Sequence, residues 1–198
     1  MSFIVSAPEG NSIPLIEAGT YTAVCIGIID IGDQYSEAFD KYSRKAIFQW
    51  EIPDEVIEID GESVPRVISE TYTASLGERS NLRKVLESWR GRMFTDEELR
   101  GFDLANVLGA PCMLNIIHKE SSQGKKFASV ASISRLPKGM HVDSATEKTL
   151  FCLDDNGALE RVEKFPEWIQ KRIKESLTYK NLVGIYGTPV AEDSELPF

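Results

Sequence analysis

The sequence predicts a mainly β protein with helices: a small β-barrel of five strands, one helix between the third and fourth strands, and a C-terminal helix. Three observations predict this fold. Five segments carry the β-branched and aromatic residues, or the alternating pattern, of strands. Two other segments place apolar residues at helical spacing. The chain of 198 residues is long enough for one well-buried core.

Glycine, proline or polar residues separate the five predicted strands. The first is TYTAVCIGIIDI at 20–31, where Gly27 indicates a bulge or a sharp bend. The second is KAIFQWEI at 45–52, which alternates as a strand with one buried face does. We expect a polar loop at 33–44 between them, and Asp60-Gly61 predicts a turn after the second. The remaining strands are RVISETYTA at 66–74, PCMLNIIHK at 111–119 and KFASVASISR at 126–135.

The helix between the third and fourth strands is predicted by periodicity. Ser75 and Glu78 stand at capping-box spacing before it, and Gly91 follows it. One apolar stripe comprises Leu82, Val85, Leu86 and Trp89.

Two short helical turns and a C-terminal helix complete the expected elements. Thr95 and Glu98 repeat the capping-box spacing, and LANVLG at 104–109 predicts a second turn. In FPEWIQKRIKESL, Pro166 stands at a plausible first helical position, and we expect this helix to pack outside the barrel. Its apolar side consists of Trp168, Ile169 and Ile173.

Three strands, a helix and two strands match the OB-fold, a five-stranded Greek-key barrel that often binds oligonucleotides, although other small barrels fit too. We expect an N-terminal extension at 1–18 and one OB-fold domain with its C-terminal helix at 19–180. Residues 181–198 are expected to form a flexible acidic tail, since they contain acids and proline without periodicity.

Charge is distributed unevenly along the chain. The net charge is −9, yet residues 41–138 sum to +1, while 1–40 and 139–198 sum to −6 and −4. A basic groove on an acidic protein is therefore compatible with the sequence.

Basic and aromatic residues are interleaved in this central part, as in proteins that bind single strands by stacking on bases and neutralising phosphates. On the predicted helix, Arg79, Arg83 and Arg90 fall within about 40° of one another. The alternative interpretation is that the charged residues lie on solvated faces and the aromatic residues lie in the core. The candidate DNA contacts are Tyr35, Phe39, Lys41, Tyr42, Arg44, Lys45, Phe48, Trp50, Tyr72, Arg79, Arg83, Arg90, Arg92, His118, Lys119, Lys125, Lys126, Phe127 and Arg135.

The C-terminus combines acids with a large apolar side chain and the chain's own carboxylate. Such a tip suits a shallow apolar pocket rimmed by Lys or Arg on a partner protein. The alternative is an arbitrary acidic terminus. The residues of the tip are Glu192, Asp193, Glu195, Leu196, Pro197 and Phe198.

The terminal DSELPF resembles the tip of bacterial single-stranded DNA-binding proteins, in which acids precede Ile-Pro-Phe; here Leu196 replaces the isoleucine. The segments at 19–32, 82–99 and 102–120 resemble single-stranded DNA-binding proteins of phages and prophages. This resemblance implies an OB-fold body that coats single-stranded DNA during phage replication or recombination, and a tip that docks on replication and repair proteins. A homo-oligomer is compatible with this resemblance.

Little in the sequence points to catalysis. There are two histidines, no Walker pattern and no Cys-x-x-Cys, and Cys25, Cys112 and Cys152 have neither disulfide-framework nor zinc-site spacing. We therefore expect no enzyme, no cofactor and no metal, although the acids of DEVIEIDGE leave a metal-dependent nuclease open. A rival interpretation is a protein-interaction module without DNA binding, either a recombination mediator or a DNA-mimicking inhibitor.

The expected location is the cytoplasm, in a host cell if the protein is phage-encoded. No stretch approaches the roughly 20 apolar residues of a membrane span, and the N-terminus lacks the pattern of a secretory signal.

Overall fold

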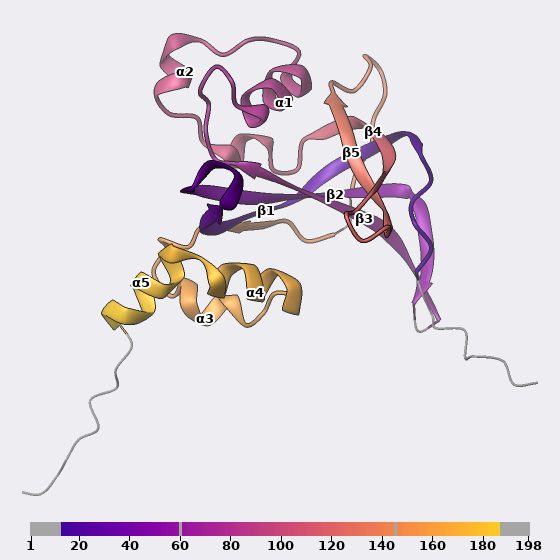
Figure 1. Cartoon of the computed structure of the whole chain (residues 1–198). Coiled ribbons are helices and arrows are strands. Elements are labelled where there is room, and N and C mark those ends of the chain that lie inside the picture. The colour runs from indigo at the N-terminus through magenta and orange to yellow at the C-terminus, as the bar shows by residue number, and fades with distance from the viewer. Residues whose placement is uncertain (1–12, 60, 145, 187–198) are drawn as a thin grey trace, which may run out of the picture.

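The computed structural model describes residues 13–59, 61–144 and 146–186 (Figure 1). Five strands form a curled antiparallel half-barrel in the order β3-β2-β1-β4-β5, and β6 pairs in parallel with β1. The strands are β1 (Gly19–Ser36), β2 (Lys41–Ile59), β3 (Glu62–Thr73), β4 (Pro111–Glu120), β5 (Lys126–Ser134) and β6 (Thr149–Phe151). The helices are α1 (Asn81–Arg90), α2 (Asp96–Arg100), α3 (Ala158–Val162), α4 (Glu167–Glu175) and α5 (Leu177–Tyr186), with 3-10 turns η1 (Glu37–Phe39) and η2 (Leu104–Val107).

This architecture confirms the predicted fold class and is consistent with an OB-like fold, because α1 lies between β3 and β4. The strands β3 and β5 stand at the two ends of the strand order. Between them, the Glu70 carboxylate accepts hydrogen bonds from the Val130 N–H and the Ser129 hydroxyl, each at 3.2 Å. A side chain therefore joins the two end strands of the half-barrel.

The bulge expected at Gly27 is present. The register of β1 against β2 shifts between Cys25 and Gly27. A Cβ at Gly27 would lie 2.7 Å from Oε1 and 3.3 Å from Cβ of Gln49 on the neighbouring strand, so a larger residue here would displace the Gln49 side chain.

The first two strands run further than predicted, and the expected loop at 33–44 is wrong. The β1–β2 ladder continues to the pair Ser36 and Lys41, and only η1 and one further residue connect the strands. Within the acidic stretch, residues 56–59 of β2 likewise pair with residues 62–65 of β3. Backbone hydrogen bonds extend both hairpins past the buried residues, where the side-chain pattern no longer indicates a strand.

The first core fills the half-barrel and is covered by α1. Leu82, Leu86 and Trp89 are buried there, and the indole N–H of Trp89 donates to the Pro111 carbonyl at 2.9 Å. The expected Ser75–Glu78 capping box is wrong: the helix begins at Asn81, and the side chain of Ser80 accepts the Arg83 N–H. Either serine, Ser75 or Ser80, is a favourable N-cap residue, so the sequence alone does not decide between them.

The Thr95–Glu98 capping box of α2 is confirmed in both of its hydrogen bonds. The turn expected at 104–109 is present as η2, which is followed by Gly109 with φ of +77°. Residues 13–18, expected as an extension, are attached to the barrel: Ile16 is buried in the first core, and Arg66 donates to the Pro14 carbonyl at 2.6 Å.

A second core lies on the outer face of the sheet, where β6 and α3–α5 pack on β1 and β2, opposite α1 and α2 (Figure 1). Ile29, Ile31 and Ile47 from the sheet meet Ile169 and Ile173 from α4. The helix α4 packs outside the barrel as expected. However, Pro166 is its N-cap rather than its first residue, and Trp168 is 47% exposed.

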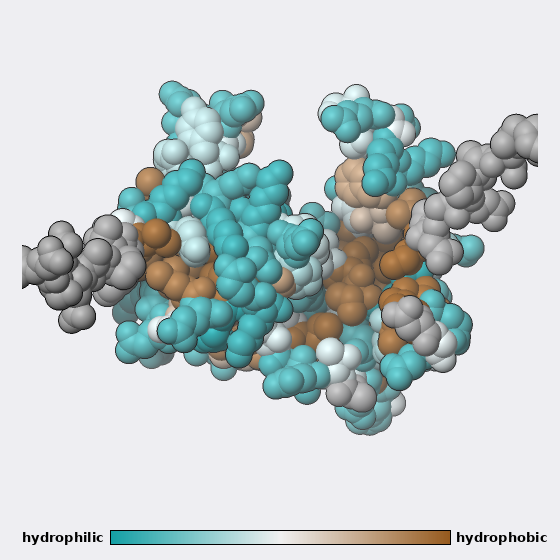
Figure 2. Space-filling view, turned by 90° about the horizontal axis from the view of Figure 1, so that it is seen from below, coloured by the Kyte–Doolittle hydropathy of each residue, from teal (hydrophilic) through white to brown (hydrophobic). Residues whose placement is uncertain are grey.

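The elements β6, α3 and α5 were not predicted, and α5 extends helical structure to Tyr186, into the segment expected as a tail. Viewed from below, polar side chains cover much of this helical side. Apolar side chains gather in a hollow over the strands away from the helices (Figure 2). No helix in the described part of the chain is long and apolar enough to cross a membrane.

Candidate nucleic-acid interface

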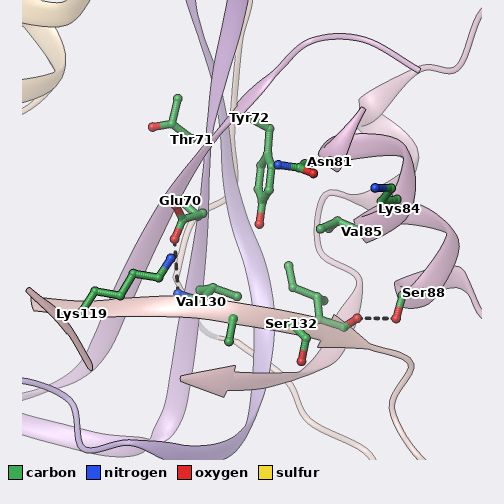
Figure 3. Close-up of a pocket in the computed structure, with 12 residues that line it drawn as sticks. Glu70, Thr71, Tyr72, Asn81, Lys84, Val85, Ser88, Lys119, Val130 and Ser132 are labelled. Carbon is green, nitrogen blue, oxygen red and sulfur yellow. Dashed lines mark hydrogen bonds between the residues drawn. The ribbon is translucent and has the colours of Figure 1, made fainter. Parts of the chain in front are cut away.

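Two adjoining hollows form a groove across the end of β3. The hairpin hollow, about 840 Å³, lies between the β1–β2 turn, the end of β3 and the loop before α1. The seam hollow, about 450 Å³, lies between β3, β5 and α1 (Figure 3). Thr71, Tyr72 and Asn81 line both hollows, so the two adjoin, and together they are called the groove.

The groove is predominantly basic. Lys41, Lys45 and Arg79 line the hairpin hollow, against one acid, Glu78. The seam hollow likewise has two bases and one acid, namely Lys84, Lys119 and Glu70. Among the described residues, none of these five cations has a carboxylate within ion-pair distance. Their charges are therefore free to act on a bound anion.

The period of a strand explains how β2 contributes to the groove. Lys41, Ser43 and Lys45 occupy alternate positions and therefore share one face, and all three line the hairpin hollow. Tyr42 and Arg44 point to the other face. There Arg44 is ion-paired with Asp30 and, at 2.7 Å, with Asp154, so its charge is already neutralised.

The aromatic residues expected at the interface divide into two groups. Phe39 is 73% exposed and lines the hairpin hollow. Tyr35 and Tyr42 are about half exposed outside the groove lining, and their rings contact each other with centroids 5.2 Å apart. A base could therefore stack on Phe39 without any rearrangement of the fold.

Phe48 and Trp50 lie in the first core at 1% and 0% exposure, so the expectation that they contact DNA is wrong for this structure. Their alternation in β2 was correct, but the face they share is the inner one. Tyr72 is 8% exposed and packs edge-on against Phe48, although it also forms part of the groove wall.

The arginines expected on the helix do not form a groove edge. Arg79 precedes the helix and lines the hairpin hollow instead. Arg83 is ion-paired with Glu87 at 3.0 Å, whereas Arg90 and Arg92 both pair with Glu98. These three guanidinium groups are therefore engaged within α1 and its connection to α2.

Glu98 is central to that connection. Hydrogen bonds from Arg92 and from the backbone N–H of Thr95 lower the pKa of Glu98 to about 2, so it stays charged at neutral pH. The guanidinium of Arg90 lies over the rings of Phe94 and Phe102, 4.4 and 4.8 Å from their centroids. Arg90 and Glu98 thus hold the α1–α2 region together.

Of the candidate DNA contacts on the β4–β5 hairpin, Lys119 lines the groove. Nε2 of His118 lies 2.8 Å from the Ile16 carbonyl oxygen and holds the N-terminal segment. Lys125, Lys126 and Phe127 are exposed near the hairpin turn, outside the groove lining. Arg135 lies against the end of α1, where a Cβ at Gly91 would come within 3.2 Å of its Cδ.

No protein-family model matches the chain, and no curated protein matches it.

The groove also contains residues that sequence reasoning missed. Asn81, Lys84, Val85 and Ser88 line the seam hollow from α1. Their spacing of three, four and seven residues defines one helical face, which the sequence pattern could have revealed beside the apolar stripe. Glu70 gave no such signal, because its role depends on the approach of β5 to β3.

The thiols of the first core are not activated. Burial raises the pKa of Cys25 to about 12, and burial also raises the pKa of Cys112. Within residues 13–59, 61–144 and 146–186, no group of three or more His, Cys, Asp or Glu could hold a metal ion. The side chains that line the groove offer charge, an exposed aromatic ring and hydrogen-bonding groups.

Proposed function

We propose that this protein binds single-stranded DNA along the groove, without a chemical step and with little dependence on overall sequence, in phage DNA replication or recombination. The observation that carries the proposal is the pair of adjoining hollows lined by five cations that have no ion-pair partner among the described residues. Phosphates lie against these cations, and one base stacks on the exposed ring of Phe39 at the rim.

The strength of the salt dependence follows from the number of free cations. Each phosphate neutralised on a single strand contributes about −0.7 to the slope of log K against log salt. If all five groove cations contact phosphates, the slope is about −3.5. Arg44, Arg83 and Arg90 add nothing to this slope, because carboxylates of the protein already neutralise them.

The test is the binding of a fluorescein-labelled oligothymidine of about 30 nucleotides, longer than the roughly 4–16 covered by one OB fold, with anisotropy measured across a salt series. A duplex of equal length serves as the control for single-strand preference. The variant Lys41→Gln, Lys45→Gln, Arg79→Gln removes the three cations of the hairpin hollow. Its slope is expected to be shallower by about 2, with weaker binding at every salt concentration.

A matched variant, Lys138→Gln, Lys164→Gln, Lys180→Gln, makes the same change in net charge at exposed positions outside the groove lining. Its binding is expected to stay close to that of the wild type. Equal loss in the two triple variants would show that net charge, rather than the groove, determines binding. No binding of oligothymidine at low salt would reject the proposal in favour of a protein-interaction module.

The proposal includes recruitment of replication or recombination proteins by the C-terminal tip. Its support is the sequence alone, in which Glu192, Asp193 and Glu195 precede Leu196-Pro197-Phe198. The tip belongs to residues 187–198, which lie outside the described part of the chain. A chain ending at residue 189 keeps the groove and lacks the tip, and so separates DNA binding from recruitment.

A further inference from the structure

Arg172 of α4 lies at the border of the groove and is tied to it from both ends. Its Nη1 donates to Oγ1 of Thr71 at 2.8 Å, and Thr71 lines both hollows. Its carbonyl accepts a hydrogen bond at 2.9 Å from the side chain of Gln34, and Gln34 pairs with Ser43, which lines the hairpin hollow. These contacts fix Arg172 over the strands whose ends form the groove.

The register of the sheet shows how a helix on the outer face, opposite α1, reaches the groove (Figure 1). Ile47 belongs to the second core together with residues of α4, and its partner on β3 is Thr71. Lys45 is the next residue of β2 on the same face, and it lines the hairpin hollow with its partner Thr73. Lys45 is therefore the diagonal neighbour of Thr71, within reach of a long side chain. Arg172 stands where the covered part of this face meets the open hollow.

The charge of Arg172 lacks a close counter-charge. Among the described residues, no carboxylate lies within ion-pair distance of its guanidinium. Burial lowers the pKa of Arg172, and the negative charge of Glu175 offsets this only in part. Glu175 itself is paired with Lys171 at 3.9 Å. An arginine stays protonated in proteins, so a bound anion would supply the counter-charge that the described residues do not.

Donors of Arg172 remain available for such an anion. With the described residues, the guanidinium forms the Nη1 bond to Thr71, and its Nε and Nη2 have no hydrogen-bond partner. Neither nitrogen is among the buried atoms that lack a partner, so both reach the surface. The planar fork of a guanidinium matches the oxygens of a phosphate, which it binds through parallel hydrogen bonds. The free edge of Arg172 therefore suits a phosphate.

We propose that Arg172 binds a backbone phosphate of the strand in the groove, so that the bound DNA crosses the edge of β3 and continues onto the side of the C-terminal helices. This inference rests on the proposed function, because it adds a sixth cation to the same groove. If all six cations contact phosphates, the slope of log K against log salt changes from about −3.5 to about −4.2.

The test is the binding of labelled oligothymidine by Arg172→Gln, with anisotropy measured across a salt series. The slope is expected to be shallower by about 0.7, which corresponds to about fivefold weaker binding near 0.1 M salt. Lys180→Gln is the matched control, because it makes the same change in net charge at an exposed position of α5 outside the groove lining. Its affinity is expected to stay within about twofold of the wild type.

A conservative variant and a measurement on the wild type separate charge from structure. Arg172→Lys keeps the charge and is expected to keep the wild-type slope, although lysine lacks the planar fork. In the wild type, oligothymidine is expected to slow the modification of Arg172 and Arg79 by phenylglyoxal, followed by mass spectrometry. Arg161, which is paired with Asp155 at 3.4 Å, should react at an unchanged rate. Thermal unfolding shows whether each variant retains the fold.

The outcomes separate the two proposals. If the wild type does not bind oligothymidine at low salt, the proposed function fails. If the wild type binds and folded Arg172→Gln loses no more affinity than Lys180→Gln, the phosphate contact fails while the function stands. Equal loss of slope in Arg172→Lys and Arg172→Gln would also overturn it, since charge would not be the cause. The same conclusion follows if oligothymidine protects Arg79 but not Arg172.

Discussion

Replacing Arg44 by methionine is expected to destabilise the fold without weakening DNA binding. Arg44 donates from Nε to Oδ1 of Asp30 at 3.1 Å and also pairs with Oδ2, and Asp30 is only 14% exposed. Hydrogen bonds to charged groups contribute about 1.5–3 kcal/mol. Because Arg44 is 35% exposed, solvent screening reduces this, and the expected loss in the free energy of unfolding is about 2 kcal/mol.

The effect should depend on pH. Burial alone would raise the pKa of Asp30, but hydrogen bonds from Arg44 and from the N–H groups of Gly32 and Leu153 outweigh it and lower the pKa below its ordinary 3.8. The charged form of Asp30 therefore stabilises the fold above its ordinary pKa. This contribution is lost as the pH falls through the lowered pKa. The difference between wild type and Arg44→Met should be largest near neutral pH and should shrink in acid.

Urea unfolding across pH measures the stability, and oligothymidine anisotropy measures the binding. Asp154→Asn is the matched control, because Asp154 is 57% exposed and its pair with Arg44 is expected to contribute less than about 1 kcal/mol. Unchanged stability in Arg44→Met, or a loss of DNA affinity greater than about twofold in the folded variant, would refute the assignment of Arg44 to the fold.

Two further changes separate the groove from the second core. Phe39→Ala removes a ring that is 73% exposed, so the melting temperature should stay unchanged while affinity for oligothymidine falls by about fivefold or more, since base stacking contributes about 1–3 kcal/mol. A fall in melting temperature would count against this role. Ile169→Ala, at a fully buried position, should lower the free energy of unfolding by about 2–5 kcal/mol in urea while preserving DNA affinity under native conditions. A loss below 1 kcal/mol would indicate that α4 is not firmly packed on the sheet.

The sequence pattern predicts the strands of the half-barrel and α1, because each has a long apolar stripe or alternation. It does not predict β6, since three residues are too few to show a period and the pairing partner lies more than a hundred residues earlier in β1. It also misses α5, whose sequence LTYKNLVGIY carries apolar residues without a clear single stripe.

The candidate site is only partly predictable for a related reason. Alternation shows that Phe48 and Trp50 share a face, but the fold decides that this face is the inner one. The Arg83–Glu87 pair is visible as an i, i+4 spacing. By contrast, the pair of Arg90 with Glu98 depends on how the chain turns after α1, which no local spacing reveals.

The strands β1 and β2 serve both cores at once. Ile28 points into the first core and Ile29 into the second, and Phe48 and Ile47 do the same on the neighbouring strand. A register shift of one residue in either strand would move the side chains of the first core to the outer face and those of the second core to the inner face. Both faces are buried at these positions, so the shift would disrupt both cores. The half-barrel and the C-terminal helices are thus expected to unfold in one transition, because both cores depend on the same register of β1 against β2.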